Sequence, residues 1–163
     1  MEIRDLVPED RDGVGRLIRE VYRESSLALW YEKEPTEQEL DKLFGIKMAA
    51  IGVGGAVDIV AVDEGRIVGE CEVVSMGSYG KIGILIEKAQ RRGGLGGKML
   101  ARAFERCPKL GIGRVVAEVA EANKEAIMFF KKHGFEETGI SEDSINRHGR
   151  DYKVAYLQRE VSG

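Results

Sequence analysis

The sequence predicts a single α+β domain built on a mixed sheet. Its 163 residues suit one domain, which would bury roughly two-thirds of the surface that the unfolded chain exposes. Apolar runs of strand length alternate with stretches whose apolar residues recur at helical spacing. No internal repeat or low-complexity linker divides the sequence. We therefore expect one domain over residues 1–163.

The first third of the sequence predicts a strand and two helices. Residues 2–7 alternate like a strand, and Pro8 then marks the beginning of a helix. A second helix is expected after Thr36, because Pro35 precedes it and Glu39 follows three positions later, as in a capping box. The apolar positions of the first helix lie on one face: Val14, Leu17, Ile18 and Val21.

Two apolar runs in AVDIVAVDEGRIVGECEVV predict a β-hairpin. They flank the turn Asp63-Glu64-Gly65, where glycine supplies the positive φ angle that a tight turn requires. The next predicted strand covers residues 81–87.

The second half of the sequence predicts two helices and three strands. The first helix should end shortly before Pro108, and its apolar stripe is Leu95, Met99, Leu100, Ala103 and Phe104. The run GRVVAEVAE is typical of a strand, because it is rich in β-branched valine. Asn123 is expected to cap a helix that continues to about His133 and ends at Gly134. The last predicted strands cover residues 135–139 and 152–160.

Composition excludes several classes of function. The formal net charge is -3, from 25 basic and 28 acidic residues, so we expect no nucleic-acid partner. No stretch approaches the ~20 apolar residues of a membrane span, so we expect a cytoplasmic protein without a membrane partner. Cys71 and Cys107 are isolated, and we expect both to be reduced and structural. His133 and His148 lack neighbouring ligands, so no metal site is expected.

The stretch AQRRGGLGGKML places four glycines in five positions directly before a predicted helix. A helix N-terminus presents unpaired N–H groups and the positive end of the helix dipole, and bare glycine backbone lets a phosphate approach them. Two known phosphate motifs do not fit. A Walker A loop would need glycine at Arg92 and serine or threonine at Met99. A dinucleotide fingerprint beginning at Gly94 would need a small residue at Met99.

The pattern that fits is Arg91-x-x-Gly94-x-Gly96, placed after a strand and at the beginning of a helix. A second block follows in VAEVAEANKEAIMFFKKHGFEETG, with a strand, an asparagine, Ala-Ile, two aromatic residues and Lys-x-Gly-Phe. With both motifs, the chain resembles the general-control-type N-acetyltransferase (GNAT) superfamily over essentially its whole length. The resemblance implies a three-layer α/β fold, in which a mixed, mostly antiparallel sheet of six to seven strands is flanked by about four helices.

The resemblance also implies that acetyl-CoA, or a related acyl-CoA, lies in a V between the strand ending at Glu87 and the strand over residues 114–121. Backbone N–H groups of the glycine-rich stretch would hold its pyrophosphate. The main chain of the preceding strand would pair with the pantetheine amides and aim one N–H at the thioester oxygen. Asn123 would either cap its helix alone or also contact the pantetheine arm. The implied cofactor-binding residues are Leu85, Ile86, Arg91, Arg92, Gly93, Gly94, Leu95, Gly96, Gly97, Asn123 and Phe130.

Attack on a thioester needs a neutral amine, and an alkylamine is only about one part in a thousand neutral at pH 7. A positioned base typically contributes roughly 10²- to 10⁴-fold. The candidate catalytic bases are Glu87, Glu72 and Glu70, in that order, because the family's layout places Glu87 nearest the thioester. Glu70 and Glu72 share strand parity and should emerge on one face about 7 Å apart. Each could act directly or through a water, and the alternative for each is a solvated carboxylate at the strand edge.

One position departs from the pattern of the family. Many members have a tyrosine where this chain has Phe130, and its hydroxyl protonates the leaving thiolate. A thiol with a pKa of about 8.5 is a tolerable leaving group near neutral pH without full protonation. Otherwise a water or one of three tyrosines would replace the missing hydroxyl: Tyr79, Tyr152 or Tyr156.

The acceptor is left open by the sequence. Trp30 and Tyr31, next to Glu32 and Glu34, would suit a cationic amine beside apolar surface, although Trp30 could equally be core or a homodimer contact. Small amines, peptide N-termini and protein lysines all fit. The leading hypothesis is an N-acetyltransferase that transfers acetyl directly from acetyl-CoA to a primary amine in a ternary complex. The alternatives are an acyl-CoA-binding regulatory module with little or no turnover and a nucleotide-phosphate binder.

Overall fold

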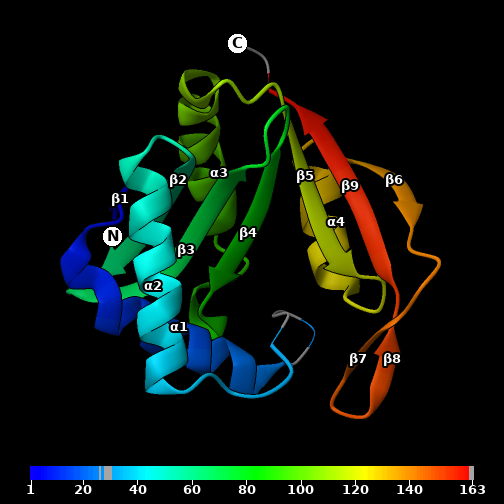
Figure 1. The fold of residues 1–163 in the computed structure, drawn as a ribbon, viewed down its shortest axis with the longest axis horizontal. Coiled ribbons are helices and arrows are strands. Elements are labelled where there is room, and N and C mark those ends of the chain that lie inside the picture. The colour runs from blue at the N-terminus through cyan, green and yellow to red at the C-terminus, as the bar shows by residue number, and fades with distance from the viewer. Residues whose placement is uncertain (26, 28–30, 162–163) are drawn as a thin grey trace.

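The central sheet has seven strands in the order β1-β2-β3-β4-β5-β9-β6 (Figure 1). The computed structural model describes residues 1–25, 27 and 31–161. All neighbouring strands are antiparallel except β4 and β5, which run parallel, so the expected mixed and mostly antiparallel sheet is confirmed. The strands of this sheet are β1 (Glu2–Asp5), β2 (Ala56–Asp63), β3 (Arg66–Ser75), β4 (Gly80–Ile86), β5 (Arg114–Ala120), β6 (Glu136–Ile140) and β9 (Val154–Glu160).

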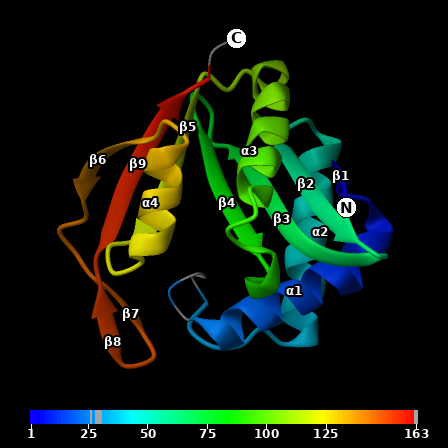
Figure 2. The same cartoon turned by 180° about the vertical axis from the view of Figure 1, so that it is seen from behind.

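Helices cover both faces of the sheet, which gives the three layers that the resemblance implied (Figures 1 and 2). On one face α1 packs against β3 and β4, and α2 packs against β2. On the other face α3 packs against β2 and β3, and α4 packs against β5 and β6. No helix within the described ranges is long and apolar enough to cross a membrane. The helices are α1 (Arg11–Glu24), α2 (Glu37–Gly52), α3 (Leu95–Arg106) and α4 (Lys124–Lys132).

Local sequence signals account for several boundaries of these elements. Glu64 and Gly65, with φ angles of 48° and 77°, form the two-residue turn that joins β2 to β3. Thr36 caps α2, because its hydroxyl accepts a hydrogen bond from the Glu39 N–H at 3.2 Å. The predicted hairpin and the predicted helix start are therefore both confirmed.

The tail of the chain departs from the prediction. Residues 152–160 do not form one strand, because β8 (Arg150–Tyr152) ends before β9 begins. A short hairpin joins β7 (Ile145–Arg147) to β8 and projects beyond the main sheet (Figure 1). Its turn residues His148 and Gly149 have φ angles of 53° and 73°. The hairpin was missed because each of its strands has three residues and no apolar alternation.

The parallel strands β4 and β5 pair only where they begin. Three residue pairs join them, from Gly80 with Val115 to Ile82 with Ala117. Beyond that point β4 continues to Ile86 and β5 to Ala120 without pairing with each other. Figures 1 and 2 show the two strands diverging. The sheet therefore opens in its middle, with a strand edge on each side of the opening.

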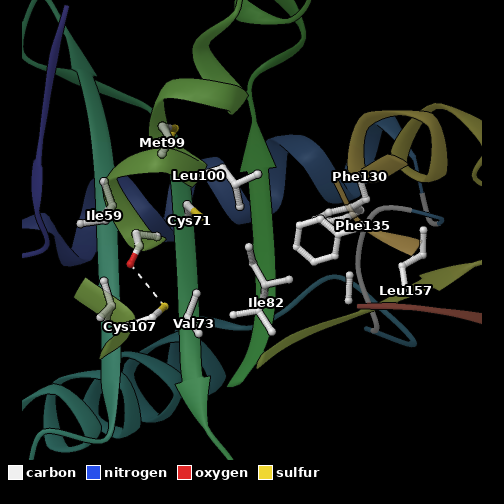
Figure 3. Close-up of a cluster of buried hydrophobic side chains, with 14 of the residues drawn as sticks. Ile59, Cys71, Val73, Ile82, Met99, Leu100, Cys107, Phe130, Phe135 and Leu157 are labelled. Carbon is white, nitrogen blue, oxygen red and sulfur yellow. Dashed lines mark hydrogen bonds between the residues drawn. The ribbon is translucent and has the colours of Figure 1, made fainter. Parts of the chain in front are cut away.

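Both cysteines are free and buried in the core between the sheet and α3, in agreement with the structural role that we expected (Figure 3). The Cys107 thiol donates a hydrogen bond to the Ala103 carbonyl oxygen at 3.3 Å. Burial raises the pKa of Cys107 to about 11, and burial also raises the pKa of Cys71. Both thiols therefore stay protonated at neutral pH, and neither supplies the thiolate that a covalent acyl-enzyme on cysteine requires.

Candidate active site

The glycine-rich turn lies between the end of β4 and the beginning of α3 (Figure 1). Gly94 directly precedes α3 and has a φ angle of 85°, in the left-handed region that glycine adopts without strain. The Lys98 N–H makes a hydrogen bond to the Gly94 carbonyl oxygen at 3.2 Å and so begins the helical ladder. The N–H groups before it point out of the helix end without a helical acceptor. This end of α3 is therefore suited to binding an anion.

The four glycines of this turn divide into two pairs with different surroundings. A side chain at Gly93 or Gly94 would meet nothing within 4 Å, so the backbone there is bare and open. A Cβ atom at Gly96 would lie 2.8 Å from the Phe129 ring, and one at Gly97 would lie 2.7 Å from the ring of His133. The second pair therefore allows α3 to approach α4 closely, a packing role that the sequence analysis did not assign.

Arg91 fixes the turn to the two elements beside it. Its Nε donates to the Ile86 carbonyl oxygen at 2.8 Å, and its guanidinium forms an ion pair with Glu24 at the end of α1. The neighbouring Arg92 has a φ angle of 65°, and its side chain is exposed. One arginine thus holds the turn in place, while the second is exposed at the helix end, with Glu125 of α4 4.0 Å away.

Leu85 and Ile86 place the edge of β4 along the opening. The Leu85 side chain packs with the core beneath α1 and α2, whereas Ile86 packs with the core beneath α3. Because the two side chains are anchored on opposite faces, the main chain of β4 forms the rim of the opening. The pairing of this main chain with pantetheine amides stays a prediction and forms part of the proposed function.

Asn123 and Phe130 lie on α4, beside β5. The Asn123 Oδ1 accepts a hydrogen bond from the Ala126 N–H at 3.2 Å, so the predicted helix cap is present. Its Nδ2 donates to the Leu27 carbonyl oxygen at 3.4 Å. Phe130 is buried and packs edge-on against Phe129 and Phe135, with ring centroids 5.3 Å and 4.9 Å away. Phe130 therefore belongs to the hydrophobic core, as Figure 3 shows.

Glu70 and Glu72 emerge on the same face of β3, as their parity predicted, and both contact Lys47 of α2. The Lys47 Nζ lies 2.8 Å from Glu70, 2.6 Å from Glu72 and 3.3 Å from Asp58 of β2. Lys47, Asp58 and Glu70 are buried, whereas the Glu72 side chain is 24% exposed. We call these four residues the Lys47 cluster. Glu72 is its one carboxylate that reaches solvent.

The charges of the Lys47 cluster are strongly coupled. Burial alone would lower the pKa of Lys47, but attraction to Glu70, Asp58 and Glu72 outweighs burial and raises it. Burial, reinforced by repulsion from Glu70, raises the pKa of Asp58 well above its usual range. One ammonium therefore faces three acidic side chains, of which Asp58 is the hardest to ionise. Oxygen atoms of the three acidic residues lie within 4.8 Å of one another, a spacing that suits a cation, and the Lys47 ammonium supplies that charge.

Glu72 also lies beside the opening in the sheet. It is the register partner of Gly83, and directly opposite residues of an antiparallel pair point to the same face. Gly83 is the first residue of β4 beyond its last pair with β5. Among the described residues, Lys47 is the ion-pair partner of Glu72, and it contacts only the Oε2 atom. The second carboxylate oxygen is therefore available to a group that enters the opening.

Glu87 lies in a different environment, at the end of β4 against α1. Its Oε1 accepts hydrogen bonds from Arg16 at 3.2 Å and from Arg66 at 2.5 Å. Burial opposes ionisation of this carboxyl, but the hydrogen bonds from Arg66 and Arg16 outweigh it and hold the pKa of Glu87 below its usual range. Glu87 is separate from the Lys47 cluster, and its lowered pKa makes it a weaker base than a free glutamate.

Tyrosines near the site differ in position. Tyr79 lies before the first β4–β5 pair, with the Arg114 guanidinium 5.4 Å from its ring centroid. Tyr156 of β9 pairs with Glu118, one strand beyond the opening. Burial, with the negative charges of the Lys47 cluster, raises the pKa of Tyr31, which places this ring within electrostatic reach of Glu72. Trp30, the other aromatic residue proposed for the acceptor, lies outside the described residues.

Replacing Lys47 with methionine is expected to lower the free energy of unfolding by about 3 to 5 kcal/mol, because the buried Glu70 and the partly exposed Glu72 lose their counter-charge. Asp58→Asn is the matched control and should be at least as stable as wild type at neutral pH. In the folded protein the pKa of Asp58 is raised above 3.8, so above about pH 4 the native state keeps a proton that the unfolded state releases. The wild type therefore loses stability as the pH rises from about 4, whereas the asparagine variant does not. Urea unfolding at several pH values measures both effects, and equal stability of Lys47→Met and wild type would contradict the coupling.

A parallel strand pair that opens beside a glycine-rich helix start is the arrangement that the resemblance to the GNAT superfamily implied. Residues 16–135 match the model of the Acetyltransferase (GNAT) family. The chain therefore belongs to this family, and the resemblance read from the two sequence motifs is confirmed.

A relative of known name and two solved structures agree with this family assignment. The chain is 34% identical over 82 residues to a protein of Bacillus subtilis (strain 168) named "Putative phosphinothricin acetyltransferase YwnH", and spans about half the length of this curated relative, 50% of each chain. It superimposes with a TM-score of 0.86 on the structure of yncA of Salmonella typhimurium with acetyl-CoA, at 18% identity over 100% of this chain and 95% of the other. A phosphinothricin acetyltransferase of Sinorhizobium meliloti in complex with AcCoA gives 0.84, at 24% identity over 99% and 88%. At these identities the two structures establish the fold.

Proposed function

We propose that the protein is an N-acetyltransferase that transfers the acetyl group of acetyl-CoA directly to a primary amine. The observation that carries the proposal is the juxtaposition of three features in one opening of the sheet. The rim of β4 supplies unpaired main chain, the beginning of α3 supplies an anion site, and Glu72 supplies a carboxylate with a free oxygen. Two of the fold neighbours hold acetyl-CoA, which supports the same cosubstrate here.

The residues around the glycine-rich turn fit a bound pyrophosphate. Gly93 and Gly94 leave bare backbone at the open end of α3, where any side chain would stand between an anion and the N–H groups. Arg92 is exposed beside them and adds positive charge. The main chain of Leu85 and Ile86 would then pair with the pantetheine amides, which directs the thioester along β4 toward Gly83.

Glu72 is the base that we propose, in place of the Glu87 that was ranked first from sequence. Glu87 shares its carboxylate with two arginines, which makes it a weaker base. Glu70 is buried within the Lys47 cluster and cannot reach an entering amine. Glu72 takes one proton of the ammonium, the neutral nitrogen attacks the thioester carbon, and the C–S bond breaks to release the CoA thiolate. The proton still surplus on the nitrogen passes to water or to the departing thiolate, which leaves a neutral amide.

Departure of the thiolate does not require a tyrosine at position 130 in this mechanism. Phe130 is part of the core and offers no proton, so the thiolate leaves as an anion or takes a proton from water. A thiol pKa of about 8.5 makes this departure feasible near neutral pH. Neither buried cysteine supplies a thiolate nucleophile, which supports direct transfer from acetyl-CoA to the amine.

A second candidate function is a regulatory module that binds acyl-CoA with little turnover, and the phenylalanine at position 130 favours it. Both candidates predict binding of acetyl-CoA, whereas only the enzyme predicts amine-dependent release of CoA.

Calorimetric titration of acetyl-CoA into the protein, with ATP and NAD as controls, tests the cosubstrate. Saturable binding of acetyl-CoA alone is expected. Absence of binding, or equal binding of ATP, would contradict the proposal.

The acceptor is expected to be a small-molecule amine, a proposal that draws on the relative's name as a phosphinothricin acetyltransferase. Peptide N-termini and protein lysines are the competing classes, and a panel of acceptors with each kind of amine separates them.

A further inference from the structure

Gly83 occupies an unusual place in the sheet. It lies in the interior of β4, opposite Glu72 and just beyond the last pair with β5. The residue is exposed, and a Cβ atom built on it would meet no atom within 4 Å. Its neighbours on the same face of β4, Lys81 and Leu85, both carry long side chains. The space beside the Glu72 carboxylate is therefore open because position 83 has no side chain.

The backbone gives no reason for a glycine at this position. Gly83 is not among the glycines with positive φ, so other residues can adopt its conformation. Glycine inside a strand weakens the strand relative to alanine. A residue that costs stability and is not required by conformation or packing is best explained by the open space that it leaves.

The charges around this space favour one kind of group. From β3 and β2, Glu72, Glu70 and Asp58 face it or lie behind it, and Lys47 of α2 is the one cation of the cluster. Tyr31 lies within electrostatic reach of the same carboxylates. Glu70 and Glu72 outnumber the Lys47 ammonium, and the nearby Lys81 of β4 is paired with Glu118 of β5 at 2.7 Å, so a second cation is attracted and a further carboxylate is repelled.

We propose that the open space beside Gly83 and the Glu72 carboxylate binds the acceptor nitrogen and the carbon atom attached to it. The inference rests on the proposed N-acetyltransferase function and narrows its substrate class. The preferred acceptors are slim primary amines, unbranched at the carbon that carries the nitrogen and without a carboxylate on that carbon. An α-amino acid such as phosphinothricin, the acceptor in the name of the Bacillus subtilis relative, is therefore expected to be a poor substrate of this protein.

The test compares wild type with Gly83→Val, and Gly139→Val is the matched control. Valine is favourable in a strand, so both variants should fold. Gly139 is also an exposed strand glycine with negative φ and open surroundings, but it lies in β6, on the far side of β5 and β9. Initial rates are measured by CoA release with three acceptors: an unbranched alkylamine, its isomer branched next to nitrogen, and an α-amino acid of similar length.

Wild type should use the unbranched amine at least tenfold better than either of the other two, in kcat/KM. Gly83→Val should lower kcat/KM for the unbranched amine by at least tenfold, whereas Gly139→Val should not change it. Calorimetric binding of acetyl-CoA should be the same in all three proteins.

Two different results would overturn the inference, and they can be told apart from a failure of the proposed function. Wild-type turnover with unchanged kcat/KM in Gly83→Val would show that the acceptor nitrogen lies elsewhere, and a preference for the amino acid would reject the substrate class. Both results leave the acetyltransferase proposal standing. Absence of CoA release by wild type with every amine would reject the proposed function and, with it, this inference.

Discussion

Replacing Glu72 with glutamine is expected to lower kcat for amine acetylation by roughly 10²- to 10⁴-fold, which is the usual contribution of a positioned base. Glutamine keeps the shape of the side chain and a hydrogen-bond acceptor for Lys47, but it cannot take a proton from the entering ammonium. Steady-state rates of CoA release with a saturating amine measure the effect. Calorimetry should give unchanged binding of acetyl-CoA, because the acceptor position that we propose beside Glu72 is separate from the glycine-rich turn.

Glu87→Gln is the matched control for this experiment, since it makes the same chemical change directly after the end of β4. It weakens the hydrogen bonds from Arg16 and Arg66 and should leave kcat within a few-fold of wild type. The reverse pattern, a large loss in Glu87→Gln and normal turnover in Glu72→Gln, would restore the order that the sequence suggested.

Replacing Gly94 with glutamate is expected to abolish measurable binding of acetyl-CoA. The new carboxylate would stand at the open N-terminus of α3 and occupy the anion site itself, in repulsion with a pyrophosphate. The position is exposed and a side chain there meets nothing within 4 Å, so the fold should persist. Calorimetric titration of acetyl-CoA measures the loss.

Gly111→Glu controls for backbone strain in this variant. Gly111 lies beyond the opposite end of α3, is exposed, has a φ angle of 73° and would also present its side chain to open space. The two variants therefore carry similar strain from a non-glycine residue with positive φ. Equal loss of binding in both would attribute the effect to folding, and full binding in Gly94→Glu would reject the proposed pyrophosphate site.

Most of the fold could be predicted from sequence because its signals are local. The glycine at position 65, the cap at Thr36 and the apolar stripe of α3 each report the conformation of their own segment. The β7–β8 hairpin was not predicted because three-residue strands are too short to show alternation. The mixed, mostly antiparallel character of the sheet came from the family resemblance and not from any local pattern, and the order of the strands was not predicted.

The site was predictable only where the main chain forms it. The motifs predict the glycine-rich turn and the edge of β4. They do not predict that Gly96 and Gly97 serve packing, because the rings that these two glycines face lie more than thirty positions away in sequence. Glu72 and Glu70 could be placed on one face by parity. Our preference for Glu72 over Glu87 as the proposed base rests on the arginines of α1 and β3, which only the folded chain brings to Glu87.

Lys47 and Asp58 were the functional-site neighbours that sequence analysis missed, although a signal exists for each. Lys47 falls on the buried stripe of α2, at helical spacing from Leu40 and Phe44, and a lysine there needs a buried acidic partner. Asp58 interrupts the apolar run of β2 in the same way. Pairing the two would have required knowing that α2 packs on β2.

The most direct measurement is the yield of acetylated amine, by mass spectrometry, against the yield of free CoA when the protein, acetyl-CoA and an unbranched primary amine are mixed. Direct transfer predicts one acetylated amine for each CoA released, with little release when the amine is omitted. CoA release that does not depend on amine would indicate thioester hydrolysis. Binding of acetyl-CoA without either product would assign the protein to the regulatory alternative and contradict the proposed acetyltransferase.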